Sequence, residues 1–112
     1  MSIAQGEEFR YEVEESEDRT GWKTTTIHCH GKLVNQTAGR IKDLVKPMIP
    51  NGGRIVLDFA DLEYLDSSGL GALVGLKVSA LNQGLVKLEL ANLSPRLKDL
   101  LTMTNLAQLF SK

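Results

Sequence analysis

The chain of 112 residues contains a single cysteine, Cys29, and carries a formal net charge of only −1 at pH 7. One cysteine cannot form an internal disulfide, which is consistent with a reducing cytosol. A net charge so close to zero gives no reason to expect a nucleic acid or an anionic membrane surface as a partner. We therefore expect a cytoplasmic protein that does not bind nucleic acid directly.

Long apolar runs are also missing from the sequence. The longest extends from Gly69 to Leu76, far short of the roughly 20 residues that a membrane-spanning helix needs. The acidic segment from Met1 to Glu15 lacks the apolar stretch of a signal peptide. We expect neither secretion nor membrane spanning, and the length predicts a single domain over residues 1–112.

Motifs of enzymes and cofactor sites are absent as well. Both histidines, His28 and His30, fall in one predicted strand, and no phosphate loop or hydrolase elbow occurs. Because side chains alternate along a strand, Cys29 points away from both histidines and the three residues cannot converge on a metal. The glycines that begin at Gly69 miss the dinucleotide-binding spacing by one residue. We predict a protein that is not an enzyme and holds no cofactor or metal.

The N-terminal part of the sequence contains the patterns of two strands. Apolar and charged residues alternate from Phe9 to Glu14, which predicts a strand with its apolar face packed inward. A threonine-rich segment follows from Trp22 to His30. A polar connection that ends in glycine separates them, so we expect an antiparallel hairpin. In the second strand, one face is expected to hold Thr25, Ile27 and Cys29, and the other Thr24, Thr26, His28 and His30.

Helical patterns and further strands alternate over the rest of the chain. Thr37 is a candidate cap for a first helix whose apolar residues recur from Ile41 to Met48, with Pro47 ending regular helix. The second helix follows the junction discussed below and ends at Gly84 in a left-handed conformation. Ser94-Pro95 begins a third helix, which Asn105 can close.

Two apolar segments complete the predicted sheet. Arg54 to Phe59 is a nearly continuous apolar run typical of a buried strand, and Val86 to Leu90 alternates with charged residues. A short final strand at Leu106 to Phe110 is an open alternative. The order β-β-α-β-α-β-α, with or without that last β, implies an α/β fold: a mixed β-sheet with helices packed on it.

The most informative stretch is Asp66-Ser67-Ser68-Gly69-Leu70-Gly71, which joins the buried strand to the second helix. A helix N-terminus carries unpaired N–H groups and a partial positive charge, so it tolerates an added anion. A serine hydroxyl there can cap the helix, whereas a phosphoserine would carry about −1.5 to −2 charges. The pattern alone leaves both roles open. The inward face of this helix is expected to hold Leu70, Leu73, Val74, Lys77 and Leu81.

The segment IVLDFADLEYLDSSGLGALVGL, residues 55–76, resembles the signature of the STAS domain in the anti-sigma factor antagonist family. In that family a partner kinase phosphorylates the first serine after the aspartate, which is Ser67 here, with Ser68 as the runner-up. The resemblance implies a STAS-like fold that binds an anti-sigma factor serine kinase when unphosphorylated and so releases a sigma factor. A serine phosphatase would reverse the modification. The implied partner-binding residues are Asp66, Ser67, Ser68, Gly69, Leu70 and Gly71.

One position departs from the resembling family. Many phosphorylatable members carry an acidic residue after the G-x-L that precedes the first helix, whereas this chain has Val34 there, followed by Asn35. This departure bears on kinase docking and on partner identity, with Asn35 as a partial substitute. A separate alternative function, of a different class, is a non-switching STAS accessory subunit of a lipid or solute transporter complex.

Several residues near the junction have two possible roles. Asp66 either orders the loop as a turn residue or contacts a partner. Asp58 is expected at the end of a strand and Asp61 in a turn, and the alternative role of both is contact with a kinase. The three glycines of the junction helix indicate a close approach to its backbone, either by the sheet beneath or by a docked partner; they are Gly69, Gly71 and Gly75.

Overall fold

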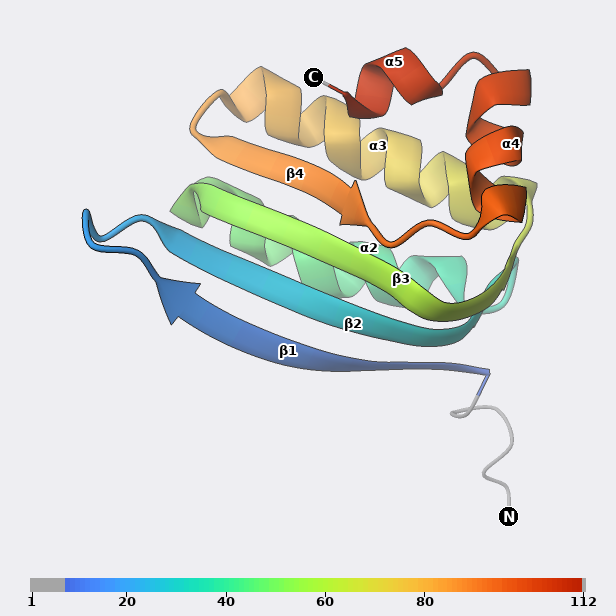
Figure 1. Cartoon of the computed structure of the whole chain (residues 1–112), viewed down its shortest axis with the longest axis horizontal. Helices are drawn as coiled ribbons and strands as arrows, with labels where there is room; N and C mark the ends of the chain where they lie inside the picture. Colours follow the sequence, from blue (N-terminus) through green and yellow to red (C-terminus); the bar gives the residue numbers. More distant parts are fainter. Residues whose placement is uncertain (1–7, 112) are drawn as a thin grey trace.

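The computed structural model describes residues 8–111, whose strands form one four-stranded sheet in the order β1-β2-β3-β4 (Figure 1). β1 is antiparallel to β2, and β2, β3 and β4 run parallel to one another. The mixed sheet with packed helices confirms the predicted fold class. The elements are β1 (Phe9–Glu17), β2 (Lys23–Leu33), α2 (Ala38–Val45), a 3-10 helix η1 (Lys46–Asn51), β3 (Gly53–Leu65), α3 (Ser67–Gln83), β4 (Val86–Ala91), α4 (Pro95–Met103) and α5 (Ala107–Phe110).

The core lies between the sheet and the helices α2 and α3, which also contact each other. Alternate residues of β2 and β3, including Ile27 and Leu57, are fully buried there. Ile41 of α2 and Leu73 of α3 meet them from the other side. Figure 1 looks onto the opposite face of the sheet, with α2 behind it. The predicted alternation of β2 is confirmed, with Thr25, Ile27 and Cys29 on the buried face.

β1 forms the predicted hairpin with β2 but is the least buried strand. Phe9 is fully buried, whereas Tyr11 and Val13, on the same face, are 39% and 43% exposed. The expectation that this alternating face packs inward is therefore correct only at the start of the strand. β1 is an edge strand. Within residues 8–111, its extensive contacts are with β2.

β3 is longer than the sequence pattern indicated, because it continues to Leu65 rather than ending at Phe59. Its parallel pairing with β2 survives two register shifts, between His28 and His30 and between Gly31 and Lys32. Asp58 and Asp61 therefore lie inside the strand. The placement of Asp58 at a strand end and of Asp61 in a turn was wrong.

Both ends of the predicted first helix show how local chemistry acts. Thr37 occupies the N-cap position, but its hydroxyl donates to the carbonyl of Lys32 at 2.7 Å and accepts from the amide of Val34 at 2.9 Å. The hydroxyl therefore braces the preceding loop instead of capping α2. Regular helix ends before Pro47, as predicted, and gives way to η1.

The C-terminal segment corrects one prediction. Residues 107–110 form the short helix α5 and not a final strand. Asn105 adopts the predicted left-handed conformation, with φ of 61°, and the amide of Leu106 returns to the carbonyl of Leu101 at 2.8 Å. This turn folds the chain back so that Phe110 packs against the core beside β4. A helix supplies its own hydrogen bonds and needs no neighbouring strand.

Within residues 8–111, every helix is too short or too polar to cross a lipid bilayer.

Candidate functional site

The junction at Asp66 is capped by the aspartate and not by a serine. Asp66 has an extended backbone, and its Oδ1 accepts a hydrogen bond from the amide of Gly69 at 2.9 Å. Its carbonyl accepts the first intrahelical bond from Leu70, also at 2.9 Å. Of the two roles that the pattern left open for the serine hydroxyls, capping α3 is wrong, because the side chain of Asp66 already fills that role.

Asp66 also ties α3 to the loop between β2 and α2. Its Oδ2 accepts from the amide of Asn35 at 3.2 Å, and its own amide donates to the carbonyl of Leu33 at 3.1 Å. Ser68 donates its hydroxyl to Oδ1 of Asn35 at 3.3 Å. The loop and the helix start therefore form one hydrogen-bonded unit. Of the two roles expected for Asp66, ordering the loop is confirmed.

The two serines differ in their surroundings. Ser67 is the first residue of α3 and its side chain is exposed, whereas Ser68 is half-buried and bonded to Asn35. The first turn of α3 contains no acidic residue, so the positive end of the helix dipole is offset there only by the Asp66 cap. Ser67 is thus the more accessible hydroxyl at a helix N-terminus.

The junction glycines divide into two groups. A Cβ on Gly69 would lie 2.2 Å from the carbonyl oxygen of Leu33 and 2.7 Å from Cδ1 of Leu65, so the helix can approach β2 and β3 only without a side chain there. A Cβ on Gly71 or Gly75 would meet nothing within 4 Å. Packing on the sheet therefore explains Gly69 but is wrong for Gly71 and Gly75, which are exposed.

An exposed stripe of small residues follows from this arrangement. Ser67, Gly71, Gly75 and Val78 recur every three or four residues, which places them on one face of a helix. All four are exposed, Val78 to 42%. We call this face the α3 stripe. It leads directly away from Ser67 along the helix and leaves its backbone open to a neighbouring molecule.

The inward face of α3 differs in part from the predicted one. Leu73 and Lys77 are buried as expected, but Leu81 is 41% exposed. The buried face is completed by Gly69, Ala72, Leu76 and Ala80. The Lys77 ammonium reaches through this face and donates to the carbonyl of Leu88 at 2.7 Å. Burial lowers the pKa of Lys77 below its ordinary value.

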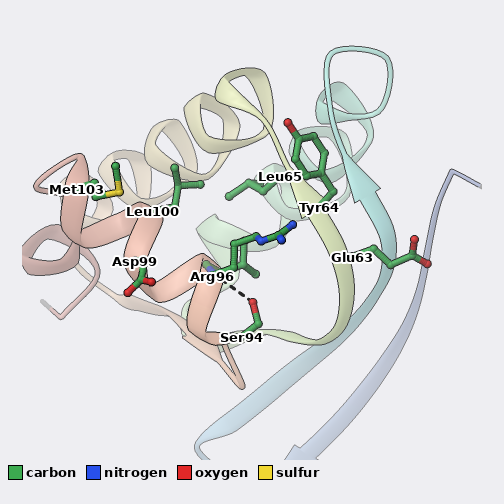
Figure 2. A pocket seen from close by; sticks show the side chains of 9 residues that line it. Glu63, Tyr64, Leu65, Ser94, Arg96, Asp99, Leu100 and Met103 are labelled. Atoms are coloured by element: carbon green, nitrogen blue, oxygen red, sulfur yellow. Dashed lines mark hydrogen bonds between the residues drawn. The ribbon is translucent and has the colours of Figure 1, made fainter.

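A groove beside the junction was not foreseen from the sequence. It has a volume of about 520 Å³ and lies between the end of β3 and α4 (Figure 2). Tyr64 is 47% and Met103 80% exposed at its walls, and Ser94 caps α4 at its base by accepting from the amide of Leu97 at 3.2 Å. The groove was missed because residues 60–65 were not expected to continue β3. Its lining is Glu63, Tyr64, Leu65, Ser94, Arg96, Leu97, Asp99, Leu100 and Met103.

The His28-Cys29-His30 segment is arranged as the strand pattern predicts. Cys29 is buried in the core, and burial raises the pKa of its thiol to about 12, so the unreactive thiol form dominates. The two histidines project from the other face of β2 and contact carboxylates of β1 and β3. Within residues 8–111, no group of three or more histidine, cysteine, aspartate or glutamate residues is arranged to hold a metal ion.

Comparison with known proteins places this geometry among relatives. A family model described as the STAS domain matches residues 11–112. A STAS-domain containing protein of Pseudomonas aeruginosa is 40% identical over 85 residues, covering 76% of this chain and 83% of that protein. The anti-sigma-B factor antagonist of Staphylococcus aureus is 32% identical over 94 residues, covering 83% of this chain and 86% of that protein. The structure of the Bacillus cell fate determinant SpoIIAA in its phosphorylated form shares the fold, with a TM-score of 0.65, 23% identity, and coverage of 88% of this chain and 86% of that one.

Proposed function

The chain belongs to the STAS domain family, and we propose that it is an anti-sigma factor antagonist whose binding is switched by phosphorylation of Ser67. One observation carries the proposal: Ser67, the first residue of α3, is exposed, while its neighbour Asp66 caps the helix. The Ser67 hydroxyl is therefore free to be modified without removing a contact that fixes the helix start. A relative named as an anti-sigma-B factor antagonist supports the general role.

The proposed partner is an anti-sigma factor that is also a serine kinase. It binds the unmodified junction from Asp66 to Gly71 together with the α3 stripe. The exposed glycines Gly71 and Gly75 let a partner backbone approach the helix closely, which any side chain at those positions would prevent. Binding the partner releases the sigma factor, and a serine phosphatase removes the phosphate.

Phosphate on Ser67 acts on the complex rather than on the fold. The N-terminus of α3 favours an anion, so the isolated domain keeps its structure. In the complex, the dianion adds bulk and lies beside Asp66, where like charge and lost solvation oppose docking. Misplaced charge in an interface costs several kcal/mol. A cost of about 3 kcal/mol weakens binding about 150-fold.

Val34 occupies the position that is acidic in many phosphorylatable relatives, but the loop that carries it is held in place. Asn35 is bonded through its amide to Asp66 and through its side chain to Ser68. We therefore expect this loop to remain part of the docking surface, with the side-chain amide group of Asn35 as its polar contact.

The proposal is tested with matched baits in lysate of the source organism. Ser67→Ala is expected to capture a serine kinase of the anti-sigma class and to resist phosphorylation. Ser67→Asp is expected to stay folded and to bind that purified kinase about 150-fold more weakly than wild type. Ser68→Ala is the matched control for the runner-up serine and is expected to be phosphorylated like wild type.

The outcomes separate the two candidate functions. If Ser67→Asp binds the kinase as tightly as wild type, the charge mechanism is wrong. If Ser67→Ala and Ser67→Asp both capture a transporter complex equally well and no phosphate is found, the protein is a constitutive accessory subunit.

A further inference from the structure

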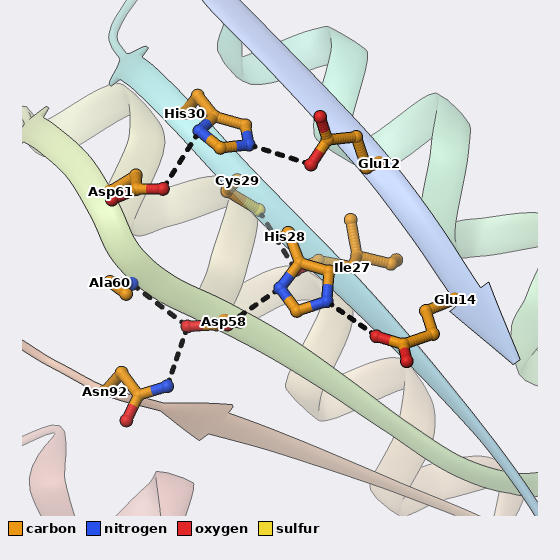
Figure 3. Close-up of polar contacts among 10 residues, drawn as sticks. All are labelled: Glu12, Glu14, Ile27, His28, Cys29, His30, Asp58, Ala60, Asp61 and Asn92. Carbon is orange, nitrogen blue, oxygen red and sulfur yellow. Dashed lines mark hydrogen bonds and ion pairs between the residues drawn. The ribbon is translucent and has the colours of Figure 1, made fainter. Parts of the chain in front are cut away.

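Two histidines of β2 each bridge the strands on either side (Figure 3). His28 places Nε2 2.9 Å from Oε1 of Glu14 on β1 and Nδ1 2.8 Å from Oδ2 of Asp58 on β3. His30 repeats the arrangement two residues along, with Nε2 3.2 Å from Oε1 of Glu12. Its Nδ1 lies 3.2 Å from a carboxylate oxygen of Asp61.

The chemistry of the ring decides which protonation state fits these contacts. A neutral imidazole has one N–H donor, and its other nitrogen is an acceptor with a lone pair. An ionised carboxylate only accepts. A ring between two ionised carboxylates therefore satisfies both only as imidazolium, which donates from both nitrogens. In the neutral form, one of the two contacts becomes a repulsion between a lone pair and a carboxylate.

The groups that face His28 favour the charged ring. Glu14 and, opposite in register, Glu12 face it from β1, and Asp58 faces it from β3. Hydrogen bonds to Glu14 and then to Asp58 raise the pKa of His28 above its ordinary value. Although partial burial opposes it, hydrogen bonds from the side chain of Asn92 and the amide of Ala60 lower the pKa of Asp58 and keep it ionised.

The groups around His30 are mostly acidic too. Glu12 on β1 and Asp61 on β3 contact the ring. Arg10 lies opposite His30 in the β1–β2 register and is the one Lys or Arg among the described residues that line the hollow beside the ring. Glu63 completes the acidic side of that hollow.

We propose that His28 and His30 form a proton-dependent clamp that holds the edge strand β1 onto the sheet. The clamp adds to a weak attachment, because Phe9 is the only buried side chain of β1 and, within residues 8–111, the strand pairs with β2 alone. The clamp is complete when both rings are charged. A ring that loses its proton gives up one bridging contact, and β1 then opens more often; for His28 this happens as the pH rises through its raised pKa. This device is independent of Ser67.

The sign of the effect follows from linkage. The pKa of His28 is higher in the folded chain than the ordinary value of 6.5, so the folded state binds the proton more tightly. The stabilisation is fully present below that value and is lost as the pH rises through the folded pKa. Both histidines are partly solvated, so we expect the modest size of an exposed ion pair.

The test is amide hydrogen exchange of the purified chain, corrected for the intrinsic effect of pH on exchange. From pH 5.5 to pH 8.5, protection of the amides of residues 11–17 is expected to fall roughly threefold, while that of α3 does not. His28→Gln combined with His30→Gln should abolish this fall. Arg54→Gln is the matched control, because it breaks the ion pair with Glu89 on the same sheet face but contacts neither histidine.

Ring nitrogen chemical shifts of the wild-type protein give a second readout that needs no variant. At pH 5.5 we expect the His28 ring to be imidazolium. The proposal is overturned if that ring is neutral at pH 5.5, if β1 protection does not change with pH, or if the double variant keeps the full change.

Discussion

The carboxylate of Asp66 accepts a hydrogen bond at 3.2 Å from the backbone amide of Asn35, 31 positions earlier in the chain. Its other oxygen caps α3 through the amide of Gly69. One side chain thus fixes both the helix start and the loop that faces it. Ser67, next in sequence, is exposed, and the helix start that carries it is held by Asp66 and not by the serine hydroxyl.

Removing this carboxylate is expected to destabilise the fold. Asp66→Ala loses the cap of α3 and leaves the Asn35 amide without its acceptor. We expect a loss of about 1 to 2 kcal/mol in the free energy of unfolding, measured by urea denaturation. Ser94→Ala, which removes only the cap of α4, should cost about 1 kcal/mol. Equal stability of Asp66→Ala and wild type would show that the two hydrogen bonds of the Asp66 carboxylate add nothing to the free energy of unfolding.

The glycines of α3 are expected to respond in opposite directions to the same substitution. Gly69→Ala forces a Cβ against the carbonyl of Leu33, which is backbone and cannot move aside cheaply, so we expect a loss of about 1 to 3 kcal/mol. Gly71→Ala meets open space and gains helix propensity, so stability should rise by about 0.5 to 1 kcal/mol. Thermal unfolding of the two variants checks this, and a stabilising Gly69→Ala would contradict the contact. If the α3 stripe is the docking face, Gly71→Ala should also weaken partner binding while it stabilises the fold.

The buried Lys77 predicts a particular pH dependence. Its pKa is lower in the folded than in the unfolded chain, so the unfolded state binds more protons and the contribution of Lys77 to stability rises with pH toward 10.5. Lys77→Met should remove this rise. Near pH 7 we expect a change within about 1 kcal/mol, because relief of the buried charge offsets the lost bond to Leu88. Lys42→Met, at an exposed position of α2, should leave the pH dependence unchanged. Urea denaturation of the three proteins across pH 7 to 10 is the measurement, and an unaltered slope in Lys77→Met would contradict the assignment.

Cys29 should react only when the chain opens. Its thiol is 1% exposed and its pKa is about 12, so alkylation of the native protein at pH 8 is expected to be slow. The rate should follow the population of unfolded molecules as urea is added. Rapid labelling of fully folded protein would show that the core is open at β2.

The sequence pattern was sufficient to predict the sheet with its helices, because strand alternation, helix repeats and end signals agreed along most of the chain. Gly84 and Asn105 ended their helices in the left-handed conformations that their residue types favour. β3 was predicted too short because its last residues, including Glu63 and Tyr64, are exposed and polar, and only pairing with β2 extends the strand. The segment 107–110 was too short for its period to distinguish strand from helix.

The candidate site was predictable in composition but not in geometry. The motif located Asp66 to Gly71, and the Asp66 cap could have been predicted, because aspartate favours the N-cap position and its bond to Gly69 is local. The second bond of Asp66, to the amide of Asn35, could not, because the two residues are remote in sequence. The different roles of Gly69 and Gly71 depend on where the carbonyl of Leu33 lies. Local spacing carries no information on such contacts, since they are set by the packing of α3 on the sheet.

The most direct measurement is site-resolved mass spectrometry of the protein isolated from its native cells, grown with and without stress and protected from phosphatases. We expect a population heavier by about 80 Da, the mass of one added phosphate, with the phosphate on Ser67. A phosphate found on Ser68 instead, or an unmodified Ser67 under every growth condition, would contradict this expectation.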